Sequence, residues 1–74
     1  MTSPDPLTHI ERCRDDAIYF ASMGGNALVD ADRLLVELGH LEFGDVHDTL
    51  KRARLYEIRD EAVRDISRAI EDAE

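Results

Sequence analysis

Apolar residues recur at intervals of three and four over most of this 74-residue chain, which is the spacing that places them on one face of an α-helix. Two glycine-containing breaks interrupt the pattern. It therefore predicts three helices, at about 6–23, 26–39 and 45–72. We expect an all-α fold: a single small three-helix domain over 6–74 whose C-terminal helix is the longest, after a disordered lead of residues 1–5.

Two capping signals compete at the start of the first helix. Asp5 followed by Pro6 offers an N-cap and then a proline at the first helical position, where its missing N–H costs nothing. Thr8 and Glu11 form a capping box three residues later. Gly24-Gly25 supplies a left-handed C-cap and a joint, so the helix is expected to end there.

The second and third helices are separated by a short connection. Asn26 is the expected N-cap of the second helix, which ends at the glycine before HLEFG, residues 40–44. Leu41 and Phe43 are the apolar residues of this connection, and we expect them to fill the core. Asp45 is the expected cap of the third helix.

The third helix changes its apolar face part of the way along. Val46, Leu50 and Ala53 share one face, whereas the apolar residues from Leu55 onward fall on the opposite face. The basic run KRAR, residues 51–54, lies at this crossover. Either the helix breaks within the run, or it continues and packs its first two turns on the second helix. Because Gly and Pro are absent, the pattern favours a continuous helix.

The later apolar stripe is the strongest candidate for self-association. A chain of this length buries a small core, and its single cysteine cannot form an internal disulfide, so association is a plausible reinforcement. We predict a helical homodimer through this stripe, unless the stripe faces the first helix of the same chain. Its principal members are Leu55, Ile58, Ala62, Ile66, Ala69 and Ile70.

Three residues depart from the amphipathic pattern. Arg59 falls inside the later apolar stripe, where it either extends its charged head into water or pairs with Asp15 or Asp16. Val29 and Val36 lie on the polar side of the second helix. They are either ordinary surface valines or a small partner-facing patch.

Charge sets the class of partner. The chain has 17 acidic and nine basic residues and a formal net charge of −8, which disfavours nucleic acid and anionic membranes. It has no apolar run of about 20 residues and no signal-peptide pattern at its start, so we expect a cytoplasmic protein. The alternative is a small dimeric DNA-binding regulator whose contacts are Lys51, Arg52 and Arg54. However, recognition helices meet bases through their N-terminal residues, and Asp45 and Asp48 stand there.

The residues that usually bind metals or catalyse reactions are sparse. His9 and Cys13 would share a helix face, and His40 and His47 flank the second connection, but no recognised zinc spacing is present. Nucleophile-elbow and phosphate-loop patterns are also absent from the sequence. We therefore expect no enzymatic activity, no cofactor and no metal.

What remains is a protein-protein interaction module. Glu37, Glu42, Asp45 and Asp48 form a stretch with no Lys or Arg between them, and such a surface attracts a partner with a basic surface. We predict a regulator or inhibitor that occupies, for example, the nucleic-acid-binding surface of another protein. In size and charge the chain is similar to phage-encoded inhibitors of host defence systems, including anti-CRISPR proteins. The simpler alternative is that acidity only keeps a small protein soluble.

Overall fold

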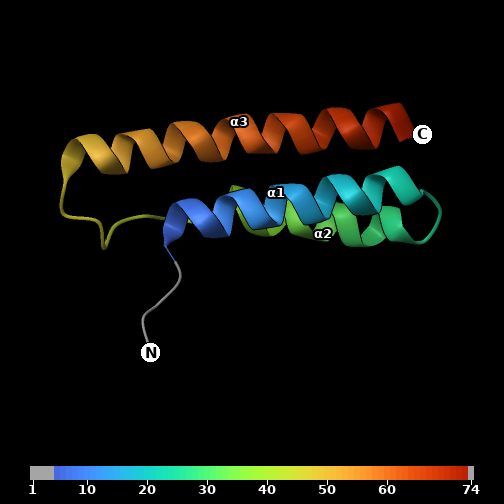
Figure 1. Cartoon of the computed structure of the whole chain (residues 1–74), viewed down its shortest axis with the longest axis horizontal. Helices are drawn as coiled ribbons and strands as arrows, with labels where there is room; N and C mark the ends of the chain where they lie inside the picture. The colour runs from blue at the N-terminus through green and yellow to red at the C-terminus, as the bar shows by residue number, and fades with distance from the viewer. Residues whose placement is uncertain (1–4, 74) are drawn as a thin grey trace.

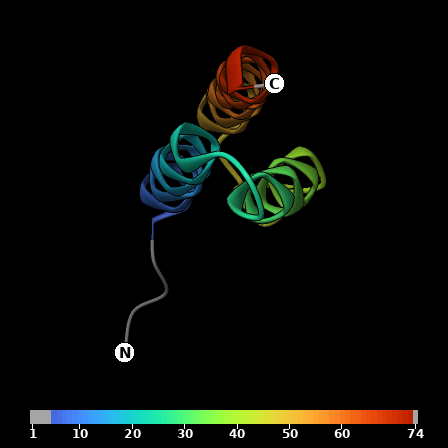
Figure 2. The same cartoon turned by 90° about the vertical axis from the view of Figure 1, so that its right-hand side faces the viewer.

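Three helices lie side by side in the computed structural model, which describes residues 5–73 (Figure 1). They are α1 (Pro6–Met23), α2 (Ala27–Gly39) and α3 (Thr49–Ala73). Successive helices run in opposite directions, and α1 packs against both others more extensively than α2 packs against α3 (Figure 2). The prediction of an all-α, three-helix fold with the longest helix at the C-terminus is confirmed. Of the predicted disordered lead, all but Asp5 lies outside the described residues.

The ends of α1 follow the local sequence signals. The Asp5 carboxylate accepts a hydrogen bond from the Leu7 N–H at 3.1 Å, and Pro6 is the first helical residue, so Asp5-Pro6 rather than the later capping box begins the helix. The helix ends at Gly24, whose N–H donates to the Ala21 carbonyl at 3.2 Å. Gly24 has φ 71° and ψ −168°, a region of backbone conformation that is essentially restricted to glycine.

Asn26 precedes α2 but does not cap it through its side chain. Its backbone is already helical, with φ −64° and ψ −22°, whereas a capping residue is typically extended. The first N–H groups of α2 find other acceptors, because Ala27 and Leu28 donate to the carbonyls of Gly24 and Gly25 at 3.2 and 3.1 Å. The glycine turn therefore takes over the role predicted for the asparagine side chain.

The third helix begins at Thr49, four residues later than predicted. Asp48, not Asp45, provides the cap, because its carboxylate accepts hydrogen bonds from the N–H groups of Leu50 and Lys51 at 3.0 and 3.2 Å. Val46 belongs to the preceding loop, where its N–H donates to the Phe43 carbonyl at 3.0 Å. From Thr49 the helix is continuous, as predicted, but the crossover between two buried faces does not exist, since Leu50 is 83% exposed.

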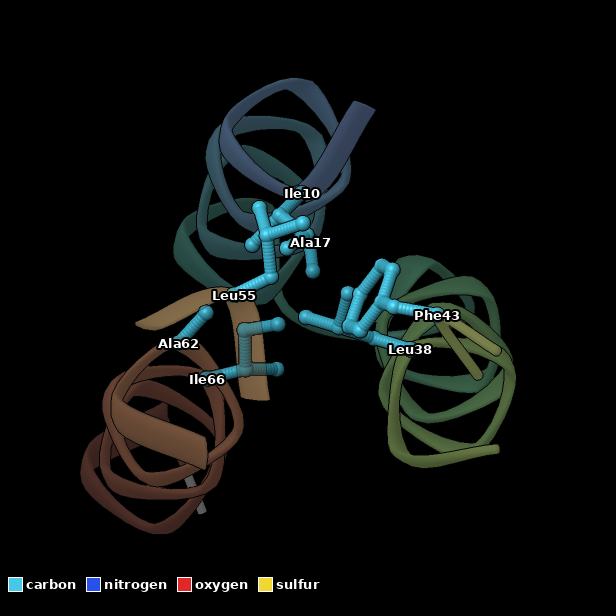
Figure 3. Close-up of a cluster of buried hydrophobic side chains, with 7 residues drawn as sticks. All are labelled: Ile10, Ala17, Leu38, Phe43, Leu55, Ala62 and Ile66. Carbon is cyan, nitrogen blue, oxygen red and sulfur yellow. The ribbon is translucent and has the colours of Figure 1, made fainter. Parts of the chain in front are cut away.

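The core lies on the axis between the three helices and is closed at one end by the loop that joins α2 to α3 (Figure 3). The small side chains Ala17 and Ala21 of α1 and Ala62 of α3 are buried between the helices. The buried cluster consists of Ile10, Ala17, Leu38, Phe43, Leu55, Ala62 and Ile66.

The stripe predicted for self-association belongs to this core. Leu55, Ala62 and Ile66 are buried within the single chain, and Ile58, Ala69 and Ile70 are half-buried. The alternative that the stripe faces α1 is therefore the one observed. The three buried residues are covered within the chain, whereas the three half-buried ones keep part of their surface exposed, and the homodimer stays a prediction.

Candidate functional site

The acidic residues predicted to bind a partner gather where α2 passes into α3. Glu37 lies near the end of α2, and Glu42, Asp45 and Asp48 lie in the loop of residues 40–48; all four are exposed. The Asp48 carboxylate caps α3. Within residues 5–73, none of the other three forms an ion pair with a basic side chain. Three carboxylates are thus available to a partner at this end of the bundle.

Side chains of α3 fix the backbone of this loop at three points. Tyr56 accepts a hydrogen bond from the Phe43 N–H on its hydroxyl oxygen at 3.0 Å. Arg59 donates from Nη1 to the Leu41 carbonyl at 2.7 Å. Arg52 donates from Nη1 to the Val46 carbonyl at 3.4 Å. We refer to Arg52, Tyr56 and Arg59 as the α3 clamp. Their spacing of four and three residues places them on one face of the helix.

Aromatic packing joins the α3 clamp to the core. Phe43 is 5% exposed and meets the Tyr56 ring edge-on, with 5.0 Å between ring centroids and 67° between ring planes. The guanidinium carbon of Arg59 lies 4.9 Å from the centroid of the Tyr56 ring, a cation-π geometry. The loop therefore follows a defined path along α3.

Arg59 has partners different from those considered in the sequence. Its side chain is 20% exposed, and it pairs with Asp60 at 2.9 Å while it holds the Leu41 carbonyl. Asp15 pairs instead with Arg14 at 3.4 Å. The guanidinium is thus neither extended freely into water nor paired across the bundle. Arg59 instead holds the backbone of the loop through the Leu41 carbonyl. The sequence pattern could not predict this contact.

The basic run considered as a nucleic-acid contact is divided by the structure. Arg52 turns to the loop, and Arg54 forms an exposed ion pair with Glu57 at 3.2 Å. Lys51 is exposed and has no ion-pair partner within residues 5–73. The one-face spacing of Arg52, Tyr56 and Arg59 was the available signal for the α3 clamp. Sequence reasoning missed Tyr56 because it treated the basic residues alone.

Cys13 is poorly suited to reactive chemistry. Burial is the main cause that raises the pKa of its thiol above the ordinary value of 9.0, and the carboxylates of Glu37 and Asp16 add to the rise. At neutral pH the sulfur is therefore protonated, and a thiol is a weaker nucleophile and metal ligand than a thiolate. His9 Nε2 lies 3.8 Å from the sulfur. In the described part of the chain, no group of three or more potential ligands is arranged to hold a metal ion.

Comparison with known proteins assigns no family: no family model, no curated protein and no solved structure matches the chain. No helix within residues 5–73 is long and apolar enough to cross a membrane. The function therefore has to be argued from the acidic loop, the α3 clamp that fixes it and the remaining exposed surface.

Proposed function

We propose that this protein is a non-enzymatic interaction module that binds a basic surface of a partner protein through Glu37, Glu42 and Asp45. It would act as a regulator or inhibitor by covering that surface. The observation that carries this proposal is the combination of three exposed carboxylates without ion-pair partners, within residues 5–73, and a loop whose path is fixed by α3. Asp48 leaves the predicted set because its carboxylate is engaged in capping.

The distribution of charge supports a basic partner. Residues 34–50 contain four acidic residues and no Lys or Arg, whereas α3 has six acidic and six basic residues. The negative potential is therefore concentrated at the end of α2 and in the loop, and complementary potentials steer association and select the partner. A groove that binds nucleic acid is one such basic surface. Its positively charged side chains bind phosphate groups, and they can bind carboxylates because carboxylates are also negatively charged.

The α3 clamp supports the same proposal through the entropy of binding. A flexible loop loses conformational freedom when it binds, and that loss reduces affinity. The loop here is anchored by hydrogen bonds at residues 41, 43 and 46. Glu42 and Asp45 lie between these anchors, so their backbone positions are set before a partner arrives.

The proposal is tested by reversing charges in two equal sets. A Glu37→Lys/Glu42→Lys/Asp45→Lys variant is compared with a control reversed at Glu61, Asp65 and Glu71, which are exposed on α3. The probe is a labelled octa-arginine peptide, followed by fluorescence anisotropy at physiological salt. The loop variant is expected to bind it about tenfold more weakly, and the control less than about threefold more weakly, because only the loop carboxylates form the site. Equal losses would mean that net charge alone attracts the peptide and would contradict the proposal.

A second arm addresses the DNA-binding alternative. Lys51→Glu/Arg54→Glu reverses the exposed cations of the basic run and leaves the α3 clamp intact. We expect no measurable binding of the wild-type protein to a labelled DNA duplex at physiological salt, because the acidic surface repels phosphate. Duplex binding that this variant abolishes would favour a DNA-binding regulator instead. Far-UV circular dichroism of every variant verifies that the helices are retained.

A further inference from the structure

A groove lies between α1 and α3 at the end of the bundle opposite the acidic loop. The two helices run in the same direction and end together (Figure 1). The groove has a volume of about 350 Å³, at the lower end of the range for ligand pockets. Its lining comes from the last turns of α1 and α3, with no contribution from α2, and consists of Ile18, Ala21, Ser22, Ala69, Asp72 and Ala73.

The floor of the groove is apolar. Four of the six lining residues are apolar, and three of these are alanines, whose short side chains leave room above them. Lysine places its methylene stem along surfaces of this kind while its charged head stays at the rim. The floor is therefore suited to a slender apolar chain.

The two polar side chains of the groove present hydrogen-bond acceptors. The Ser22 hydroxyl donates its proton to the Tyr19 carbonyl at 2.7 Å, so its oxygen can only accept a further hydrogen bond. An ionised carboxylate also has acceptors alone. Asp72 forms no ion pair within residues 5–73. An occupant that satisfies both side chains has to donate hydrogen bonds.

The ends of the two helices favour a positive charge at the groove. Carbonyl groups at a helix C-terminus carry partial negative charge, which basic residues in the last turn stabilise. Neither α1 nor α3 has a basic residue in its last turn. The end of α3 instead carries Glu71 and Asp72, an arrangement that the same electrostatics disfavours. Departures from a local rule are expected at functional sites, and here a bound cation would offset the cost.

The basic residues closest to the groove along the two helices have other surroundings. Arg14, one turn before Ile18, pairs with Asp15 at 3.4 Å. Arg68, one turn before Asp72, forms no ion pair with it and does not line the groove. It lies on the outer face of α3 among other charged side chains: Glu61, Arg64, Asp65 and Glu71. Among residues 5–73, Asp72 is thus the one charged residue that lines the groove.

We propose that this groove binds a lysine side chain of a partner protein. The methylene stem lies on Ile18 and the alanines, and the ammonium group donates hydrogen bonds to the Asp72 carboxylate and the Ser22 hydroxyl. An ammonium group fits two acceptors on different helices because its three donors rotate freely, whereas a planar guanidinium favours both oxygens of one carboxylate. This inference does not rest on the acidic loop, which lies at the other end of the bundle.

The test compares two acetylated and amidated peptides, Gly-Lys-Gly and Gly-norleucine-Gly, whose central side chains differ only in the ammonium group. Each is titrated into the isotope-labelled protein at physiological salt and followed by two-dimensional NMR. The lysine peptide is expected to bind about fivefold more tightly than the norleucine peptide and to shift the amide signals of residues 18–22 and 69–73. Equal binding of the two peptides, or shifts confined to the acidic loop, would overturn the proposal.

Two neighbouring substitutions separate the groove from the net charge of the protein. Asp72→Asn and Glu71→Gln each remove one negative charge from an exposed position, but only Asp72 lines the groove. Asp72→Asn is expected to bring the two peptides within about twofold of each other, whereas Glu71→Gln keeps the preference of about fivefold. Equal losses would overturn the proposal. Both variants are expected to fold, because each removes an acidic residue from a helix C-terminus, and circular dichroism verifies this.

A third variant tests the apolar floor, and light scattering tests the occupant. Ala73→Leu fills the groove from an exposed position without changing the charge, and it is expected to weaken the lysine peptide about fivefold. Unchanged binding would overturn the proposal. Lys51 is the single lysine of the chain. A concentration-dependent dimer that both Lys51→Gln and Asp72→Asn abolish would make a second copy the occupant and would overturn the assignment to another protein.

Discussion

The two connections between the helices are held in different ways. The turn at Gly24 and Gly25 joins α1 to α2 through positive-φ glycines and backbone hydrogen bonds between residues three apart. The loop of residues 40–48 is instead held by side chains of α3 that are 6, 13 and 18 residues away in sequence from the groups they bind. The glycine turn is thus fixed by its own backbone, whereas the loop is fixed by contacts with α3 and depends on the packing of that helix.

This difference makes the loop of residues 40–48 better suited to binding a partner than the glycine turn. A turn that depends on glycine conformation presents few side chains and has little to offer a partner. A loop anchored from beneath can present acidic side chains outward while its backbone stays in place. Arg52 and Arg59 of α3 therefore support the backbone of the acidic loop. The comparison predicts that a substitution which loosens one connection leaves the other in place.

The largest effect is expected from removing the aromatic anchor of the loop. Phe43→Ala deletes a buried side chain that packs on Tyr56, so we expect the free energy of unfolding to fall by about 3–5 kcal/mol. Small domains have little stability to lose. In a urea titration followed by circular dichroism, the variant is therefore expected to lose its helical signal at a much lower urea concentration than the wild-type protein. The control is Leu50→Ala, at a side chain that is 83% exposed, and should change stability by less than about 0.5 kcal/mol. A small loss for Phe43→Ala would contradict the anchoring role.

A smaller effect is expected at the glycine turn. Gly24→Ala places a side chain at φ 71° and ψ −168°, which we expect to cost about 2 kcal/mol through backbone strain alone, since no atom lies within 4 Å of the added carbon. Gly39→Ala is the matched control, because Gly39 is helical and equally unobstructed. It should be neutral or stabilising by up to about 1 kcal/mol. Equal effects in thermal unfolding would show that the conformation of Gly24 is not the cause.

The smallest effect is expected from removing one hydroxyl of the α3 clamp. Tyr56→Phe leaves the Phe43 N–H without its acceptor, and we expect a loss of about 1 kcal/mol. The exchange of that amide hydrogen, followed by NMR, should accelerate about fivefold while the amides of the glycine turn are unchanged. Tyr19→Phe, at an exposed tyrosine, should alter neither quantity. Faster exchange in both connections would mean that they are not independent.

The sequence predicted α1 more accurately than α3 because the two helices begin differently. Asp5-Pro6 and the paired glycines specify the ends of α1 through local conformation and short-range hydrogen bonds. Both Asp45 and Asp48 are acceptable caps for α3, and propensity alone does not choose between them. The choice depends on the turn from Phe43 to Val46 and on the contact of Arg52 with that turn, which are tertiary interactions.

In the candidate site, too, some features could be predicted from the sequence and others depend on tertiary contacts. The sequence was sufficient to predict the exposure of Glu37, Glu42 and Asp45, because charged side chains remain in water unless they are paired. It was also sufficient to place Val29 and Val36 on the outer side of α2. The role of Arg59 was not accessible, because its main partner is the carbonyl of Leu41, a backbone group in a segment that has no regular structure.

By itself, the sequence determined three helices, an acidic surface around the second connection and the apolar stripe from Leu55 onward, because these follow from periodicity and charge along the chain; the second apolar face that it predicted for the start of the third helix was wrong. Only the tertiary structure decided that Leu55, Ala62 and Ile66 are buried within one chain and that Arg52 and Arg59 hold the acidic loop. The physical reason is distance along the chain. Periodicity reports which face of a helix is apolar, but the partners of that face, and of the arginines beside it, are set by how the helices pack.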